Sequence, residues 1–282
     1  MAGTSRDLAL SFDSVAHTYD DIRPHYPAAL FDDIESITGL RRGDRVFEIG
    51  CGTGIATRSL LDRGFVVDAV EPGPTMARIA LERAHGLPLH VEPGTFETWK
   101  PGDRSYTAVF SATAIHWVDP RVRWAKAASV LRDGGHLALA TTRTVDGGGF
   151  ADLNAMSQDL HDEHLFSDFG RSPSSESLET ALTAAGDDIG LVWGEADPKG
   201  GAHPAGSWFE PSVVRTYHWE QSYDATEAVR LLSTYSAYLA MDDDRRSALM
   251  DSLARLVDEE LGGSVSRPYL SILAVARGAT GN

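Results

Sequence analysis

Apolar positions between residues 45 and 140 follow two alternating periods. Five short apolar runs, each typical of a strand, occur at Val46–Ile49, Val66–Val70, Leu87–Val91, Ala108–Ser111 and His136–Ala140. The segments between most of them repeat apolar residues at helical spacing. Continuous apolar strands that alternate with helices are typical of a parallel sheet covered on both faces. The pattern therefore predicts a doubly wound α/β fold.

Helix start and stop signals accompany these runs. A proline begins each of three expected helices, and glycine follows each one. The pairs are Pro27 with Gly39, Pro74 with Gly86, and Asp119-Pro120 with Gly134-Gly135. The third helix is expected to extend through Leu131, and another is expected to begin near Ile55.

The composition and periodicity of the sequence change after residue 142. Residues 150–206 are rich in Ser, Asp, Gly and His and have weak helical periodicity. Strands are expected at 213–223 and 269–276, with helices at about 225–240 and 243–261 between them. The predicted organisation is an N-terminal helical segment (1–40), a ligand-binding core (41–145), an insertion or cap (146–210) and C-terminal elements that complete sheet and cap (211–282).

Composition narrows the range of partners. The chain of 282 residues has 25 Lys and Arg against 41 Asp and Glu, a net charge of −16, so a nucleic acid is an improbable partner. No apolar run approaches the roughly 18 residues of a membrane helix, and Met1–Ser11 shows no secretory signal, so a cytoplasmic location is expected. Cys51 is the sole cysteine, which excludes an internal disulfide. The oligomeric state is not indicated.

A glycine-rich turn follows the first expected strand. Gly50, Gly52 and Gly54 lie between that strand and the next helix, where backbone can approach a ligand closely. Glu71 ends the second strand, seventeen residues past Gly54, where a carboxylate can bind both hydroxyls of a ribose. Together these features predict a nucleotide-like ligand.

Spacing and charge separate two classes of such ligand. A dinucleotide motif needs a third glycine three positions after the second, but Ile55 and Thr57 occupy the candidate positions. Glu48, just before the turn, would repel a pyrophosphate but attract a ligand with an ammonium and a sulfonium. S-adenosylmethionine has both groups.

The motifs resemble those of class I S-adenosylmethionine-dependent methyltransferases. Val46–Gly54 (VFEIGCGTG) is similar to their first motif, and Ala69–Pro72 (AVEP) to their second-strand acidic motif. Glu92–Glu97 resembles their adenine-side turn. Ser111–Pro120 and Phe12–Pro27 resemble the branch that includes trans-aconitate methyltransferase-like and many natural-product enzymes. This branch implies a mostly parallel seven-stranded sheet with an N-terminal segment over the methionine end of the cofactor.

The resemblance also implies particular cofactor contacts. The three glycines would face the cofactor and Glu71 the ribose, while Ser111 would offer its carbonyl to the ammonium. Met76 and Tyr19 have a second interpretation, as ordinary packing residues. Thr95 stands where the family often has Asp, so the usual carboxylate contact to the adenine amine would have to come from a hydroxyl, a backbone group or nothing. The expected cofactor-binding residues are Tyr19, Glu48, Gly50, Gly52, Gly54, Glu71, Pro72, Met76, Thr95, Phe96, Glu97, Ser111, Ala112, His116 and Trp117.

Four further features have competing interpretations. His116, after the fourth strand, is a candidate base for an acceptor that must lose a proton, or a structural partner of Trp117. His161 and His164, with Asp168 nearby, could bind a metal, but a solvated helix face is the preferred interpretation and no metal is expected. Cys51 is expected to pack. The aromatic residues expected to form the acceptor wall are Trp193, Trp208, Phe209, Tyr217, Trp219, Tyr235 and Tyr238.

The expected function is methyl transfer from S-adenosylmethionine to a small, largely apolar or aromatic metabolite, with natural-product biosynthesis as a possible setting. Two alternatives remain: a cyclase or other non-methylating protein that keeps the cofactor, and a nicotinamide-dependent oxidoreductase. Acceptor specificity is expected to reside in the N-terminal segment and the cap after residue 142. A fold and a cofactor do not by themselves specify an acceptor.

Overall fold

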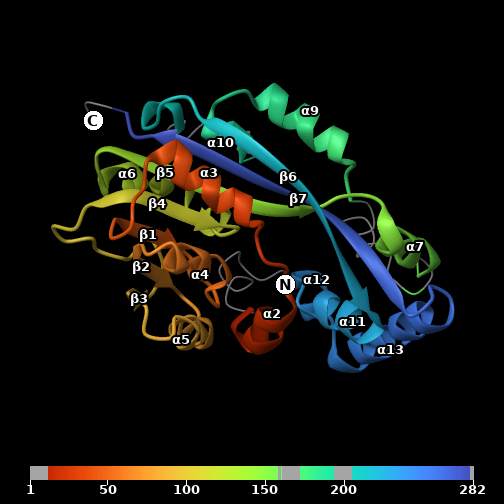
Figure 1. Cartoon of the computed structure of the whole chain (residues 1–282). Helices are drawn as coiled ribbons and strands as arrows, with labels where there is room; N and C mark the ends of the chain where they lie inside the picture. The colour runs from red at the N-terminus through yellow and green to blue at the C-terminus, as the bar shows by residue number, and fades with distance from the viewer. Residues whose placement is uncertain (1–11, 158–159, 161–171, 194–204, 280–282) are drawn as a thin grey trace.

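The computed structural model describes residues 12–157, 160, 172–193 and 205–279. Its seven strands form one sheet in the order β3-β2-β1-β4-β5-β7-β6 (Figure 1). The strands are β1 (Arg45–Ile49), β2 (Val66–Glu71), β3 (Leu89–Pro93), β4 (Tyr106–Ala112), β5 (Leu131–Thr144), β6 (Val213–Asp224) and β7 (Ser264–Arg277). The first five pair in parallel, whereas β7 is antiparallel to β5 and β6. The predicted doubly wound, mostly parallel seven-stranded sheet is confirmed.

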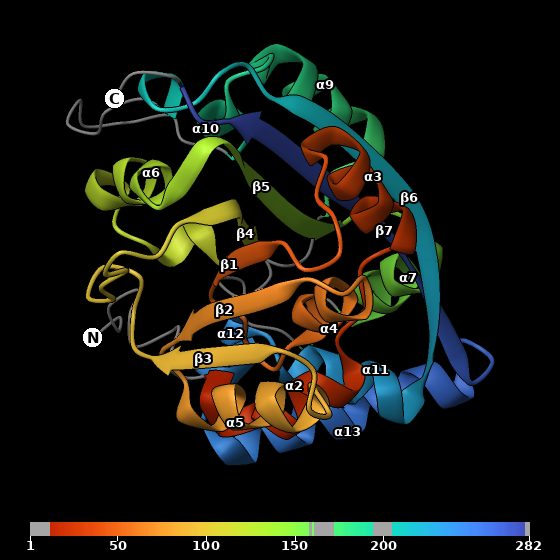
Figure 2. The ribbon, with the colours of Figure 1, turned by 60° about the vertical axis from the view of Figure 1, so that its left-hand side comes forward.

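Helices cover both faces of the sheet (Figure 2). They are η1 (Phe12–Val15), α2 (Ala16–Ile22), α3 (Ala28–Thr38), α4 (Ile55–Asp62), α5 (Pro74–Arg83), η2 (Ile115–Trp117), α6 (Pro120–Ser129), α7 (Gly148–Met156), α9 (Ser175–Ala185), α10 (Ile189–Val192), η4 (Ala205–Ser207), α11 (Ala225–Ser233), α12 (Ser236–Leu239) and α13 (Asp243–Glu259). None of these helices has the length and apolar character that crossing a bilayer requires, within the described residues.

Two apolar clusters hold the central strands between the helices. On one face, Phe31 of α3 and Leu60 of α4 pack with Phe110 of β4. On the other face, Trp124 of α6 packs with Leu137 of β5. All five side chains are almost fully buried, and burying a large apolar side chain contributes on the order of 1.5–3 kcal/mol.

Several expected boundaries were wrong in detail. The strands β5 and β7 each begin five residues before the expected starts at His136 and Tyr269. Leu131 begins β5 rather than ending α6, which stops at Ser129. The strand expected at Leu87–Val91 runs instead over Leu89–Pro93, because residues 84–88 form a turn whose backbone bonds link Leu87 to Ala84. The single helix expected over 225–240 is divided at Thr234, whose hydroxyl bonds the Leu231 carbonyl. Side-chain bonding to a nearby carbonyl competes with continuation of the helix.

The helices between the last two strands gather with α2 at one end of the sheet (Figure 1). Their apolar cluster includes Ile22 of α2, Leu231 of α11 and Leu253 of α13. Arg230 of α11 also forms an ion pair with Asp21 of α2 at 2.9 Å. Segments from the two ends of the chain therefore form one helical cap beside the carboxyl ends of the parallel strands.

Candidate functional site

A cavity of about 560 Å³ opens where β1, β2, β4 and β5 end, beneath the helical cap. Its size lies within the range of small-molecule sites, and its position at the carboxyl ends of parallel strands is where ligands of doubly wound folds bind. Thirteen of the fifteen residues expected at the cofactor lie on its wall. They are Tyr19, Glu48, Gly50, Gly52, Glu71, Pro72, Met76, Thr95, Phe96, Glu97, Ala112, His116 and Trp117.

The glycine turn brings backbone to the cavity. Gly50 and Gly52 both adopt left-handed conformations, with φ of 70° and 55°. A Cβ atom at Gly50 would lie only 2.6 Å from the Cβ of Ala114. Side chains are therefore excluded here by conformation and by contact, which leaves the wall open to a ligand.

Gly54 and Ser111 lie outside the cavity wall. Gly54 caps α4 with φ of 89°, and a Cβ atom there would lie 3.2 Å from the backbone of Ala80 in α5. Its small size therefore serves helix packing. The Ser111 hydroxyl is fully buried and donates to the Ile49 carbonyl at 3.0 Å, which ties β4 to the end of β1.

The carboxylate of Glu71 stabilises the glycine turn through hydrogen bonds. It accepts hydrogen bonds from the backbone N–H of Gly52 at 2.9 Å and of Gly73 at 2.8 Å. The side chain is only 6% exposed, and burial raises its pKa above the usual value although the two amides oppose that rise. A carboxylate oxygen accepts more than one hydrogen bond, so a diol in the cavity can share these oxygens with the turn.

Replacing Glu71 by alanine is expected to weaken S-adenosylmethionine binding about 10- to 100-fold. A hydrogen bond to a charged group contributes on the order of 1.5–3 kcal/mol, and the variant also leaves the two amides without their acceptor. Titration calorimetry on the folded variant measures the change. Glu82→Ala, which removes an exposed carboxylate on α5, is the matched control. Wild-type affinity in folded Glu71→Ala would contradict the ribose role.

Glu48 supplies a second carboxyl group on the cavity wall. One oxygen accepts from the Thr57 hydroxyl at 2.7 Å, whereas the other, Oε1, has no hydrogen-bond partner. The side chain is 0% exposed, and burial, with a smaller contribution from Glu71, raises its pKa to about 7. A buried carboxyl group with one unpaired oxygen is suited to a cationic ligand. The chemistry of this wall therefore fits S-adenosylmethionine.

The affinity for S-adenosylmethionine is expected to rise about 25-fold between pH 5.5 and 7.5. The cation needs the ionised form of Glu48, which grows from about 3% to about 75% of molecules over this interval when the pKa is about 7. Binding should therefore release protons. Calorimetry in buffers of different ionisation enthalpy measures this release, and Glu48→Gln should abolish most of the pH dependence. An affinity that falls as the pH rises would contradict the assignment.

Asp13, which was not among the residues expected at the site, links the N-terminal segment to it. Its Oδ1 atom accepts from the backbone N–H of Thr75 at 2.8 Å and of Met76 at 2.9 Å. It thereby caps the first turn of α5 from a position about sixty residues away. No local sequence signal marks this contact, because its two halves meet only in the folded chain.

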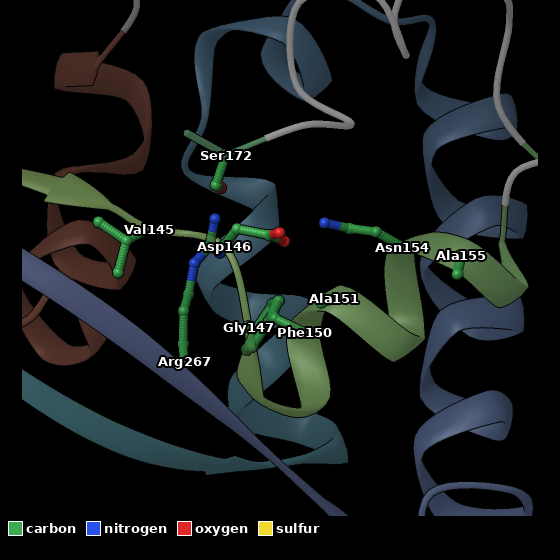
Figure 3. A pocket seen from close by; sticks show the side chains of 9 residues that line it. All are labelled: Val145, Asp146, Gly147, Phe150, Ala151, Asn154, Ala155, Ser172 and Arg267. Atoms are coloured by element: carbon green, nitrogen blue, oxygen red, sulfur yellow. The ribbon is translucent and has the colours of Figure 1, made fainter. Parts of the chain in front are cut away.

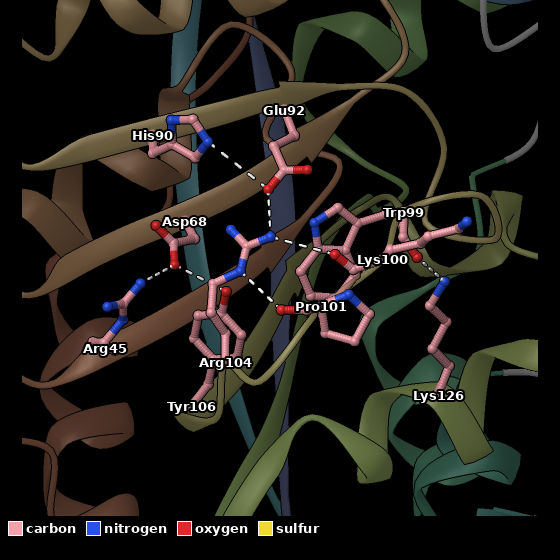
Figure 4. A network of polar contacts seen from close by, with 10 residues as sticks. All are labelled: Arg45, Asp68, His90, Glu92, Trp99, Lys100, Pro101, Arg104, Tyr106 and Lys126. Atoms are coloured by element: carbon pink, nitrogen blue, oxygen red, sulfur yellow. Dashed lines mark hydrogen bonds and ion pairs between the residues drawn. The ribbon is translucent and has the colours of Figure 1, made fainter.

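A polar network holds the adenine-side turn (Figure 4). The ammonium of Lys126 donates to the carbonyls of Glu97 and Trp99 at 3.0 Å and 2.5 Å. Trp99 in turn stacks on Phe47 with ring centroids 3.9 Å apart. Thr95 occupies the position where the family often has Asp, and its hydroxyl lies 3.2 Å from that of Thr98. Two hydroxyl groups thus stand where the family often has a carboxylate.

The cap meets the N-terminal segment at Arg23. Its guanidinium donates to the side chain and the carbonyl of Thr234, at 2.9 Å and 3.0 Å. The same group lies 4.7 Å from the ring centre of Tyr19 and 4.4 Å from that of Tyr235. Such cation–π contacts contribute about 0.5–2 kcal/mol each, so Arg23 joins the two halves of the cap above the cavity.

His116 projects from η2 on the acceptor side of the wall. Its ring is exposed toward the cavity and contacts Trp117 at a centroid distance of 4.9 Å. No hydrogen bond joins its nitrogens to any described residue. Desolvation by the surrounding protein, aided by Arg143 and Arg123, lowers its pKa to about 4. The imidazole is therefore neutral near pH 7 and can accept a proton.

The expected acceptor wall is realised differently. Of the seven aromatic residues named from the sequence, Tyr235 lines the cavity. Trp208 and Phe209 pack on the core beneath α6, and Trp219 stacks on Tyr269 at 4.6 Å. Tyr217 donates to Asp33. No described residue between 146 and 210 lines the cavity, whose cap-side wall includes Tyr269 instead.

Two further sequence expectations concern ligating side chains. His161 and His164, with Asp168, lie outside the described residues. Among the residues that the structure does describe, no group of three or more His, Cys, Asp or Glu side chains could hold a metal ion. Cys51 is buried against Ala77 and Ala80, and burial raises the pKa of its thiol, which makes it a packing residue rather than a nucleophile.

The chain matches known methyltransferase sequences. Residues 46–135 match the model of a methyltransferase domain. An uncharacterised methyltransferase of Mycobacterium tuberculosis is 39% identical over 142 residues, which cover 49% of this chain and 55% of the relative. Trans-aconitate 2-methyltransferase of the same species is 37% identical over 100 residues, 33% of this chain and 36% of that enzyme. The matched regions therefore span about half the length of the first relative and about a third of the second.

Solved structures show the same fold. A putative type II methyltransferase from Anaeromyxobacter dehalogenans is 23% identical with a TM-score of 0.58, covering 90% of this chain and 97% of that one. The [4+2]-cyclase SpnF is 16% identical with a TM-score of 0.50, covering 99% and 98%. At such identities the likeness establishes the architecture and leaves the reaction open.

Proposed function

We propose that this chain is a class I S-adenosylmethionine-dependent methyltransferase, which transfers the methyl group of S-adenosylmethionine to a small, largely apolar or aromatic metabolite. The match of residues 46–135 to a methyltransferase domain supports the proposal. The observation that carries the proposal is the pairing of Glu48 and Glu71 on one cavity wall. Glu48 offers an unpaired oxygen to a cation, and Glu71 stands beside the glycine turn to bind a ribose.

Methyl transfer from a sulfonium is an in-line displacement, so the protein chiefly aligns the acceptor and excludes water. The cap joined by Arg23 encloses the acceptor side of the cavity. Thr142 and Thr144 line the cavity from β5, Tyr269 from β7, and Tyr235 from the cap. Neutral His116 takes a proton from a hydroxyl or carbon acid as the methyl group arrives. This lining of aromatic rings and hydroxyl groups supports a small organic acceptor, and the net charge of −16 disfavours a nucleic acid.

A non-methylating reaction is the second candidate, because the fold matches that of the [4+2]-cyclase SpnF over almost the whole of both chains. Such a protein would keep the same cofactor cavity. Transfer of label from methyl-labelled S-adenosylmethionine to a small molecule separates the two candidates.

Calorimetry is expected to show binding of S-adenosylmethionine and its demethylated product, and none of nicotinamide dinucleotides. The reason is the missing third glycine together with the carboxyl group of Glu48 on the ligand side of the turn. Incubating the labelled cofactor with extracts of small metabolites then tests transfer. Binding of a dinucleotide without binding of S-adenosylmethionine would overturn the proposal.

A further inference from the structure

A second cavity, of about 120 Å³, lies between α7 and β7. Figure 3 shows the polar ends of Arg267, Asp146, Asn154 and Ser172 turned toward the same space, with Phe150 at its base. A water molecule takes up about 30 Å³ of liquid, so this chamber has room for a carboxylate group and adjoining carbon atoms. None of its residues belongs to the cofactor site described above.

Arg267 gives this chamber a buried positive charge, and Asp146, which is exposed, supplies a carboxylate on its wall. Its side chain is only 8% exposed, and its Nη1 atom has no hydrogen-bond partner. The guanidinium lies 4.4 Å from the ring centre of Phe150 and 5.3 Å from that of Tyr235. No carboxylate of a described residue lies within ion-pair distance. A buried cation without an anionic partner is costly to maintain, so a ligand that supplies the anion would be favoured.

The chamber lies beside the main cavity. Alternate residues of a strand point to the same face, and Thr142 and Thr144 of β5 line the main cavity just before Asp146 lines the chamber. On β7, Tyr269 lines the main cavity and Arg267, two residues earlier, lines the chamber.

One layer of side chains separates the two spaces. The hydroxyl of Thr144 lies 3.1 Å from that of Ser172, which lines the chamber. The ring of Tyr235 has Arg23 of the main cavity 4.4 Å from its centre and Arg267 of the chamber 5.3 Å from it. Thr144, Ser172 and Tyr235 therefore lie between the two spaces.

We propose that the acceptor carries a carboxylate group, which binds Arg267 in this chamber while the apolar body of the acceptor lies against Tyr235 and Tyr269. This inference rests on the proposed methyl transfer and narrows its substrate class. The planar fork of a guanidinium matches a carboxylate, and Ser172 and Asn154 add neutral donors. A phosphate dianion would need more than one cation, and Asp146 would oppose it.

Binding of paired probes tests the chamber. Aromatic and long-chain carboxylic acids that carry a hydroxyl group are each compared with their neutral primary amides, by calorimetry on the full chain saturated with S-adenosylhomocysteine. The tightest acid is expected to bind at least about tenfold more tightly than its amide, as a charge-assisted hydrogen bond requires. The proposal would be overturned if the amides bind as tightly as the acids. It would also be overturned if S-adenosylhomocysteine binds but none of the acids does. Failure of S-adenosylhomocysteine to bind would instead contradict the proposed function.

Two variants assign the effect to the chamber. Arg267→Met keeps the volume of the side chain and should remove the preference for the acid while leaving the affinity for the amide within about twofold. Ala151→Leu narrows the chamber from α7 with Arg267 intact and should also weaken the acid, so the test survives if Arg267→Met does not fold. Asp146→Asn is the matched control and should bind the acid at least as tightly as the wild type. An unchanged acid preference in folded Arg267→Met and Ala151→Leu would place the carboxylate elsewhere.

Discussion

Replacing His116 by alanine is expected to lower the turnover number about 10²- to 10⁴-fold, the usual contribution of a positioned general base. Cofactor affinity should change little, because the glycine turn, Glu48 and Glu71 lie on another part of the wall. The open position of the ring and its lack of a hydrogen bond to any described residue favour this role over the structural one. Single-turnover rates and calorimetry on the same preparation separate the two effects.

The pH dependence of the rate provides a second measure of His116. Because its pKa is lowered to about 4, the imidazole is already neutral at pH 6, and the part of the rate that depends on it should stay level from pH 6 to 8. His90→Ala, which removes an exposed histidine from β3, is the control and should keep wild-type turnover. Loss of folding or of cofactor binding in His116→Ala would restore the structural interpretation.

The second large effect is expected from Gly50→Ala, which should lower the free energy of unfolding by about 2 to 5 kcal/mol. An L-residue in the left-handed conformation costs about 1–2 kcal/mol, and overpacking commonly adds about 1–3 kcal/mol. Gly50 has φ of 70°, and the new Cβ would lie 2.6 Å from that of Ala114. Cofactor binding should weaken as well, since any relaxation moves the turn that forms the wall.

A double variant separates the two causes. Adding Ala114→Gly removes the close contact but not the backbone strain, so it should recover about 1–3 kcal/mol of the loss. Gly52→Ala is informative beside it, because a Cβ atom there meets nothing within 4 Å and only the conformational cost should appear. Denaturant unfolding measures all three variants. Additive behaviour of Gly50→Ala and Ala114→Gly would show that the two positions do not meet.

The core of the fold followed from local signals. Apolar runs of strand length and prolines at helix starts identified five parallel strands and the helices between most of them, with errors of up to five residues at element ends. Short segments of this kind are governed by side-chain periodicity and by capping, both of which act over a few residues. The division of the last helical pattern at Thr234 could not be predicted, because a hydroxyl bond back to Leu231 is decided by the packed environment.

In the candidate site, too, residues placed by local order were predicted, and most of those placed by tertiary contacts were not. Glu48, Gly50 and Glu71 were named from the sequence because a strand, a turn and a helix that follow one another place them at one sheet edge. On the acceptor side, Tyr235 was named from the sequence but Tyr269 was not, and both reach the cavity through tertiary contacts that no local pattern indicates. Most of the aromatic residues expected there pack elsewhere, because composition indicates that aromatic rings are buried but not against which surface.

By itself, the sequence determined the architecture and the class of cofactor. Both depend on short-range order: the period of apolar residues, the positive φ that glycine allows, and a carboxylate at the end of a strand. Only the tertiary structure decided what closes the cavity, for example the bond from Arg23 to Thr234, which are 211 positions apart. It also decided that Arg267 lies beside Tyr235 as a buried cation. Such long-range contacts arise from the packing of whole elements, which no local pattern encodes.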